Sequence, residues 1–430
     1  MPEFRPVVAH TPKRPIAAAG EVAGDLQRVQ NFYFFAAAII LVYVFSFTFM
    51  LEQIRDVLAA LVGFVCVVSL VIALQTARPT GAGLLLVVCI AILALTGMAN
   101  LVMYQPPGGL AELVRNLAGM FILGWAAIQR FSFRKFDRFL TISALAAGVA
   151  CLALAVINDP IYRAGTIRMG AITSQMEDLH PSAYLTVVMF FWLAAIAYFK
   201  RLPLICGALM LGLMFLLYAY KAEAAQYMWL YMVVAYAGLS VTNRRMTEIL
   251  TRLLPILLIL SFAGFFIYLW TTQQSWDIYI GSGRIGTWLD RIARIIARPL
   301  DEQLFGLGPG SDAFHGSLTW SYKATHSHND FLSVTLEYGL IGLAAFSLLM
   351  ISLVLALPPY LRVFATLVML AGFFSGGMLF KPTVAPIMAL AILHTRMMYD
   401  AARTRSGGRA YRPQLFSFKH QASPRPAPSR

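Results

Sequence analysis

Twelve long apolar runs, separated by polar loops, make up most of this 430-residue chain. Each run is close to the ~20 residues that an α-helix needs to cross the hydrocarbon core of a bilayer. Backbone amides find no water in that core, so the chain must satisfy them within helices. The runs lie at residues 32–51, 57–75, 81–103, 110–129, 139–157, 181–199, 202–219, 224–241, 252–270, 331–356, 361–379 and 383–399. We therefore predict an all-α polytopic membrane protein with about 12 transmembrane helices.

The composition agrees with this prediction. Hydrophobic residues make up 59% of the chain and charged residues 13%, against ~45–50% and ~25% in ordinary soluble proteins. A water-soluble fold cannot bury so much apolar surface, which excludes a secreted enzyme, a disordered chain and a simple nucleic-acid-binding protein. The net charge of +14 points to cytoplasmic loops and membrane lipids with anionic headgroups, and we expect no nucleic-acid partner.

The basic residues alternate between the loops. They gather in both tails and in every second loop, whereas the short loops between those carry at most one Lys or Arg. Two longer segments that fall on the outer side, 158–180 and 271–330, depart from this rule. Because basic residues mark the cytoplasmic side, we predict that both termini are cytoplasmic. The predicted divisions are a disordered cytoplasmic tail at 1–30, helices 1–9 at 31–270, one long outer loop at 271–330, helices 10–12 at 331–399 and a basic cytoplasmic tail at 400–430.

The long outer loop is the main candidate for function. Loops longer than ~12–15 residues are usually either functional or disordered, and this one is rich in aromatic residues. Within it, the apolar residues Trp288, Ile292, Ile295 and Ile296 follow a helical spacing. The basic residues Arg291, Arg294 and Arg298 lie between and after them. This spacing predicts an amphipathic helix that lies at the membrane interface.

The densest group of reactive side chains precedes the run that begins at Phe331. It reads His326-Ser327-His328-Asn329-Asp330. With Asn329 or Asp330 as the N-cap of a helix, His328 would stand at the positive end of the helix dipole, which favours the neutral imidazole that accepts a proton. The alternative is a polar cap flanked by two surface histidines. No third ligand has a suitable spacing for zinc, so we expect no metal and no cofactor.

Three other features carry charge or unusual flexibility. Glu337 lies inside an apolar run, which indicates either a functional group or a link to a loop arginine. The segment 306–310, GLGPG, has glycines that let a backbone approach a ligand closely, although a turn explains it more simply. Lys221 is either half of a turn pair with Glu223 or a cation that faces an outer cavity.

An ordered set of motifs in and after the long loop resembles the O-antigen ligase and O-antigen polymerase superfamily, which includes exopolysaccharide polymerisation proteins. The resemblance covers only the region from 282 to 342, and the rest of the chain matches in topology alone. The motifs are Ser282-Gly283-Arg284 with Trp288, Pro299-Leu300 leading to Gly306-Leu307-Gly308-Pro309-Gly310, His328-Asn329 with Leu332, and Glu337-x-Gly339-Leu340-Ile341-Gly342.

The resemblance implies a multi-pass protein of the bacterial inner (plasma) membrane whose active site faces the periplasm. Such a protein is a metal-independent, inverting glycosyltransferase. It would transfer a glycan from undecaprenyl diphosphate to a hydroxyl of an acceptor glycan or glycolipid during lipopolysaccharide or exopolysaccharide biosynthesis. Ligase and polymerase differ only in the acceptor, and we place the ligase first. A lipid-linked sugar transporter and a scaffold for polysaccharide assembly are the alternatives from other classes.

The resemblance also suggests roles for individual residues. The essential histidine of the family falls on His328 and its loop arginine on Arg284, and we count both as catalytic together with Lys221. The Ser-Arg pair that carries a second family arginine is absent here. Lys221 is the nearest cation to that position, and Arg168 is the other candidate to replace the missing charge. The residues predicted to bind substrate are Arg168, His326, Asn329, Glu337 and Gly308.

Overall fold

A computed structural model describes most of the chain. The described ranges are 16–48, 52–77, 79–106, 108–129, 134–157, 161–163, 166–168, 179–220, 223–272, 284–314, 329–375 and 384–405.

Within these ranges, twelve long helices coincide with the twelve apolar runs. Seven of them, α1 to α5, α9 and α13, are long and apolar enough to cross a membrane. The prediction of an all-α polytopic membrane protein is confirmed at this level, and the count of twelve crossings stays a prediction. The helices are α1 (Ile16–Thr48), α2 (Glu52–Ala77), α3 (Gly81–Tyr104), α4 (Gly109–Ile128), α5 (Arg134–Ile157), α6 (Leu179–Phe199), α7 (Pro203–Tyr220), α8 (Glu223–Val241), α9 (Arg244–Thr272), α13 (Asp330–Ala356), α14 (Pro359–Ser375) and α15 (Val384–Arg405).

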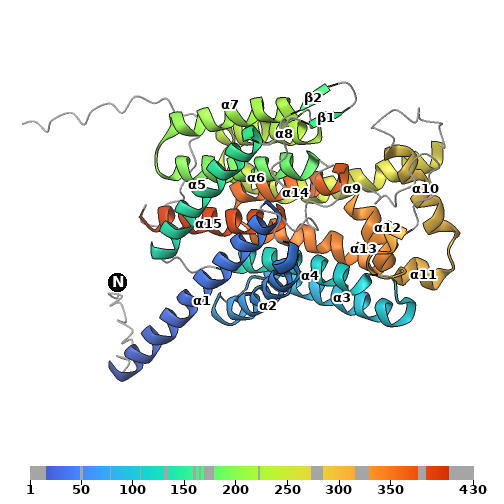
Figure 1. Cartoon of the computed structure of the whole chain (residues 1–430), viewed down its shortest axis with the longest axis horizontal. Helices are drawn as coiled ribbons and strands as arrows, with labels where there is room; N and C mark the ends of the chain where they lie inside the picture. Colours follow the sequence, from blue (N-terminus) through green and yellow to red (C-terminus); the bar gives the residue numbers. More distant parts are fainter. Residues whose placement is uncertain are drawn as a thin grey trace, which may run out of the picture.

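The two longer loops that we expect on the outer side contain the remaining elements. A short antiparallel hairpin, β1 (Ile161–Arg163) and β2 (Thr166–Arg168), precedes α6. The long loop holds α10 (Arg284–Ala297), α11 (Leu300–Phe305) and α12 (Ser311–Phe314). Figure 1 shows α10, α11 and α12 at one end of the molecule, whereas α1 begins and α15 ends toward the other. This arrangement fits the predicted separation of the long loop from the termini.

Helix α13 is the element against which the long loop packs, together with several neighbouring helices. Helices α3, α9, α10, α11, α12 and α14 all pack against it. Near its start, aromatic rings from four helices meet: the ring of Phe373 lies 3.8 Å from that of Phe262, and 5.6 Å from that of Trp288. Phe331 completes the group, 5.3 Å from Phe262. Aromatic packing of this density fixes the position at which α13 begins.

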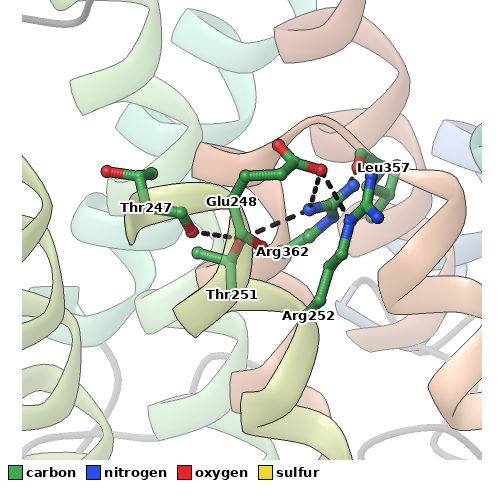
Figure 2. A network of polar contacts seen from close by, with 6 residues as sticks. All are labelled: Thr247, Glu248, Thr251, Arg252, Leu357 and Arg362. Carbon is green, nitrogen blue, oxygen red and sulfur yellow. Dashed lines mark hydrogen bonds and ion pairs between the residues drawn. The ribbon is translucent and has the colours of Figure 1, made fainter. Parts of the chain in front are cut away.

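Contacts at the ends of the helices fit the predicted orientation. Arg362, at the start of α14, donates from Nη1 to Glu248 Oε1 (2.8 Å) and from Nε to the carbonyl of Leu357 (2.9 Å), as Figure 2 shows. Arg252 donates to the same Glu248 oxygen at 2.8 Å. Both α9 and α14 begin at loops that the distribution of basic residues predicts to be cytoplasmic. An alternating topology requires such loops to meet on one side of the membrane.

Candidate functional site

The structure describes only part of the predicted site. Lys221, His326 and His328 lie outside the described residues. Arg284 is the first residue of α10 and Arg168 the last residue of β2, and only their backbone positions are described. The roles predicted for these five side chains therefore stay predictions, and the described geometry concerns the framework around them.

That framework is organised by a break in helix α13. At Gly339 the backbone has φ 68° and ψ −169°, which is not a helical conformation. A residue with a Cβ atom rarely adopts such a positive φ, whereas glycine does so at little cost. A break inside a candidate membrane span requires new partners for the backbone groups it releases, because unpaired groups are costly there.

The GLGPG segment supplies those partners. The amide of Leu307 donates to the carbonyl of Leu336 at 3.1 Å, and the amide of Gly308 donates to the carbonyl of Glu337 at 2.9 Å. A Cβ atom on Gly306 would lie 2.5 Å from the carbonyl carbon and oxygen of Glu337, so the segment can approach only as glycine. We call residues 306–310 together with residues 336–339 the glycine clasp.

Two further side chains, Asn100 and Arg298, complete the glycine clasp, and only Arg298 stood among the residues noted in the sequence. Asn100, buried in α3, donates from Nδ2 to the carbonyls of Glu337 (3.1 Å) and Phe305. Arg298 donates from Nη1 to the carbonyl of Leu336 at 3.3 Å. Burial lowers the pKa of the Arg298 guanidinium, and the charge of Glu302 opposes that shift. A polar Asn100 inside an apolar run was the available signal, since such a residue must find partners within the protein.

The side chain of Glu337 adds a further hydrogen bond between the two halves of the glycine clasp. Its Oε1 accepts the Gly310 amide at 2.9 Å, and its Oε2 lies 3.5 Å from Asn116 Nδ2. Asn116, on α4, donates to the Tyr338 hydroxyl at 3.2 Å as well. Among the described residues, no arginine forms an ion pair with Glu337. One prediction was that Glu337 links the long loop to α13 through a loop arginine. In the structure Glu337 does link the two, but by accepting the backbone amide of Gly310.

Substitution of Glu337 separates its two predicted roles. We expect Glu337→Gln to keep both activity and thermal stability, because the glutamine oxygen can accept the Gly310 amide. Glu337→Ala leaves that amide unpaired and opens a cavity, so it should destabilise the protein by about 2–4 kcal/mol. Thermal unfolding of the purified proteins in detergent measures both effects. Loss of activity in Glu337→Gln at unchanged stability would instead show that the ionisable group itself is functional.

Asn329 forms the N-cap of α13 and is one of the two residues, with Asp330, that the sequence proposed for this position. Its Oδ1 accepts the amides of Phe331 (3.0 Å) and Leu332 (3.1 Å), and its Nδ2 donates to the carbonyl of Phe373 in α14 at 2.8 Å. The side chain is fully buried. Its amide thus fixes the start of α13 against α14, immediately after His328 in the sequence. A direct contact between Asn329 and substrate stays a prediction.

Gly308 also has structural contacts that explain its identity. It has φ 97°, and a Cβ atom there would lie 3.1 Å from Pro106 and 3.4 Å from Asn100. Its amide already donates to Glu337. The structure therefore accounts for glycine at this position by close packing, and the predicted contact with substrate is not needed to explain it.

One prediction for helix α10, the exposure of Arg291, is wrong. We expected Arg291 on the exposed polar face of an amphipathic helix, but it is only 1% exposed, comparable with Trp288 at 4%. Arg291 follows Trp288 by three residues and precedes Ile295 by four, so all three share the buried face. Ile296, expected on the apolar face, is 49% exposed. The sequence pattern missed the partner that makes burial of Arg291 possible.

Comparisons of the chain with known protein families, curated proteins and solved structures found no match. The motifs in the sequence, and the contacts by which the described residues hold them, are therefore what indicates a function.

Proposed function

We propose that this chain is an O-antigen ligase-like membrane glycosyltransferase of the bacterial inner membrane, with its active site facing the periplasm. Its donor is a glycan linked to undecaprenyl diphosphate, and its acceptor is a sugar hydroxyl of a glycan or glycolipid. A polymerase that joins two carrier-linked repeat units remains the second candidate, because the motifs do not define the acceptor.

One observation carries the proposal. The glycine clasp joins two of the motifs on which the resemblance rests, GLGPG and Glu337-x-Gly339, although 27 residues separate Gly310 from Glu337. A third motif residue, Asn329, caps the same helix, and α10 with Arg284 as its first residue packs against it. Motifs that serve one site are expected to be held on one rigid support, since catalysis depends on close positioning.

The proposed reaction is a single displacement. An acceptor hydroxyl oxygen forms a bond to the anomeric carbon as the bond between that carbon and the diphosphate oxygen breaks. The electron pair leaves with undecaprenyl diphosphate, and His328 takes the hydroxyl proton. Arg284 and Lys221, with Arg168 as the alternative to Lys221, neutralise the charge that develops on the diphosphate. Attack from the face opposite the leaving group inverts the anomeric carbon.

The break in α13 is the observation that favours a transporter, because transporters often bind their substrates at interrupted helices. In those proteins the free backbone groups at the break face a cavity. Here the carbonyls of Leu336 and Glu337 accept bonds from Leu307, Gly308, Asn100 and Arg298. The glycine clasp thus occupies the break, which makes glycosyl transfer the better-supported function.

The test uses purified full-length protein, an undecaprenyl-diphosphate-linked oligosaccharide and a chelator. Lipid A-core is supplied as acceptor in one arm, and a second carrier-linked repeat unit in the other. We expect a new glycosidic bond with inverted configuration in one arm, detected by mass spectrometry and by NMR of the anomeric proton. Movement of the lipid-linked sugar across a vesicle without any new bond would show a transporter. Folded protein that forms no bond with either acceptor would contradict the proposal.

A further inference from the structure

A buried polar network joins three elements of the long loop and α13. On α10, Arg291 Nε lies 3.2 Å from Asp312 Oδ1, and its Nη2 donates to the Asp312 carbonyl at 3.2 Å. Asp312, on α12, accepts a bond from the hydroxyl of Ser333, on α13, at 2.7 Å through Oδ2. Arg291 is 1% exposed and Asp312 is completely buried.

Burial of this ion pair needs a reason other than stability. Removing two charges from water costs about as much as their attraction returns, so well-packed apolar residues would often hold a fold equally well. The best-attested use of such a pair is to select one arrangement of the elements that carry it. The Arg291 guanidinium contacts both the side chain and the backbone carbonyl of Asp312, so it holds α12 at two points.

Two of these elements, α10 and α13, begin at or next to residues proposed for catalysis. Arg284 precedes Arg291 by seven residues, about two helical turns, so the two positions share one face of α10. Ser333 lies one turn into α13, where its amide donates to the carbonyl of Asn329 at 2.9 Å. His328 immediately precedes Asn329. The network therefore connects the helix that starts with Arg284 to the helix start beside His328.

We propose that Arg291, Asp312 and Ser333 are positioning residues that set the separation of Arg284 and His328 for glycosyl transfer. The inference rests on the proposed function. These three residues act through the helices that they join, and none of them contacts the reacting atoms. Their loss therefore acts on the rate of the bound complex more than on the binding of substrate.

The kinetic test compares Asp312→Asn and Ser333→Ala with the parent protein. Asp312→Asn removes the charge that pairs with Arg291, and we expect kcat to fall by about 10–100-fold, because small misplacements at an active site have effects of this size. KM should change by less than about threefold. Ser333→Ala keeps the ion pair and the fold and should show a smaller fall in kcat of the same kind.

The matched control is Arg294→Gln. Arg294 lies on the same helix and pairs with Asp290 at 3.0 Å, but both side chains are partly exposed. We expect its kcat and KM to equal those of the parent. Equal kcat values for the parent, Asp312→Asn and Ser333→Ala would overturn the proposal, as would a loss in Arg294→Gln as large as that in Asp312→Asn.

A distance measurement tests the same inference without activity. Spin labels are attached at Gly286→Cys, where a side chain meets open space, and at the exposed Leu348→Cys on α13, with the four native cysteines replaced by alanine. We expect a narrow distance distribution in the parent and in Arg294→Gln, and a broader one in Asp312→Asn. An unchanged distribution overturns the positioning role. A parent without transfer activity but with the expected broadening in Asp312→Asn assigns the failure to the proposed function alone.

Discussion

His328→Ala is expected to lower the rate of glycosyl transfer by about 10²–10⁴-fold, the range that one general base contributes. Alanine cannot take the proton of the attacking hydroxyl, so the oxygen must attack while still protonated. The rate is measured as product formed by the purified variant from the undecaprenyl-diphosphate-linked donor. Donor binding should change little, because the diphosphate is held by the proposed cations.

The matched control is His315→Ala, which removes a histidine of the same outer loop that no motif includes. We expect this variant to transfer at the rate of the parent. His328→Ala protein that is present at the normal level and forms normal amounts of product would show that His328 is not the base. In that case the His326-to-Asp330 segment would be a polar cap, which is the alternative interpretation of its sequence.

The largest effect on folding is expected from Gly339→Ala. The alanine would have to adopt a positive φ of 68°. Its Cβ atom would lie only 2.2 Å from the carbonyl oxygen of Leu304 and 2.5 Å from the amide nitrogen of Phe305. Backbone atoms cannot move aside as a flexible side chain does, so the glycine clasp must open. We expect a loss of about 3–5 kcal/mol of stability, at the upper end of single substitutions. Size-exclusion profiles and thermal unfolding in detergent measure it.

Gly264→Ala provides the control for that experiment. Gly264 lies within α9 at an ordinary helical φ, and an added Cβ atom meets nothing within 4 Å. Alanine favours a helix by up to about 1 kcal/mol over glycine, so this variant should be as stable as the parent or slightly more stable. A Gly339→Ala protein as stable as Gly264→Ala would mean that α13 is not broken at this residue.

Much of the helical framework could be predicted from local sequence. The length of each apolar run predicted the positions of the twelve long helices, because a helix satisfies its own backbone and needs no distant partner. The N-cap at Asn329 was predictable for the same reason, since capping depends on residues two and three positions away. The amides of Phe331 and Leu332, which donate to Asn329 Oδ1, are found where this rule places them.

The candidate site was predictable only in its residues. The sequence indicated Glu337 and the GLGPG segment as unusual, and the resemblance grouped them, but neither showed that they touch. Their contact depends on a break in α13 that local propensity does not predict, because glycine at 339 permits that conformation without requiring it. Asn100, more than 200 residues earlier in the chain, donates to the carbonyl of Glu337, which also accepts the amide of Gly308.

That this protein is a bundle of apolar helices with one long polar loop could be read from its sequence, because both properties follow from short segments of chain. How that loop packs against the bundle depends on contacts between distant residues. The helical pattern assigned Arg291 to the polar face of α10, yet the structure buries it. Burial is possible because the carboxylate of Asp312, 21 residues further along the chain, lies beside the guanidinium. A buried charge is tolerable only beside its partner, and the position of that partner is a property of the fold.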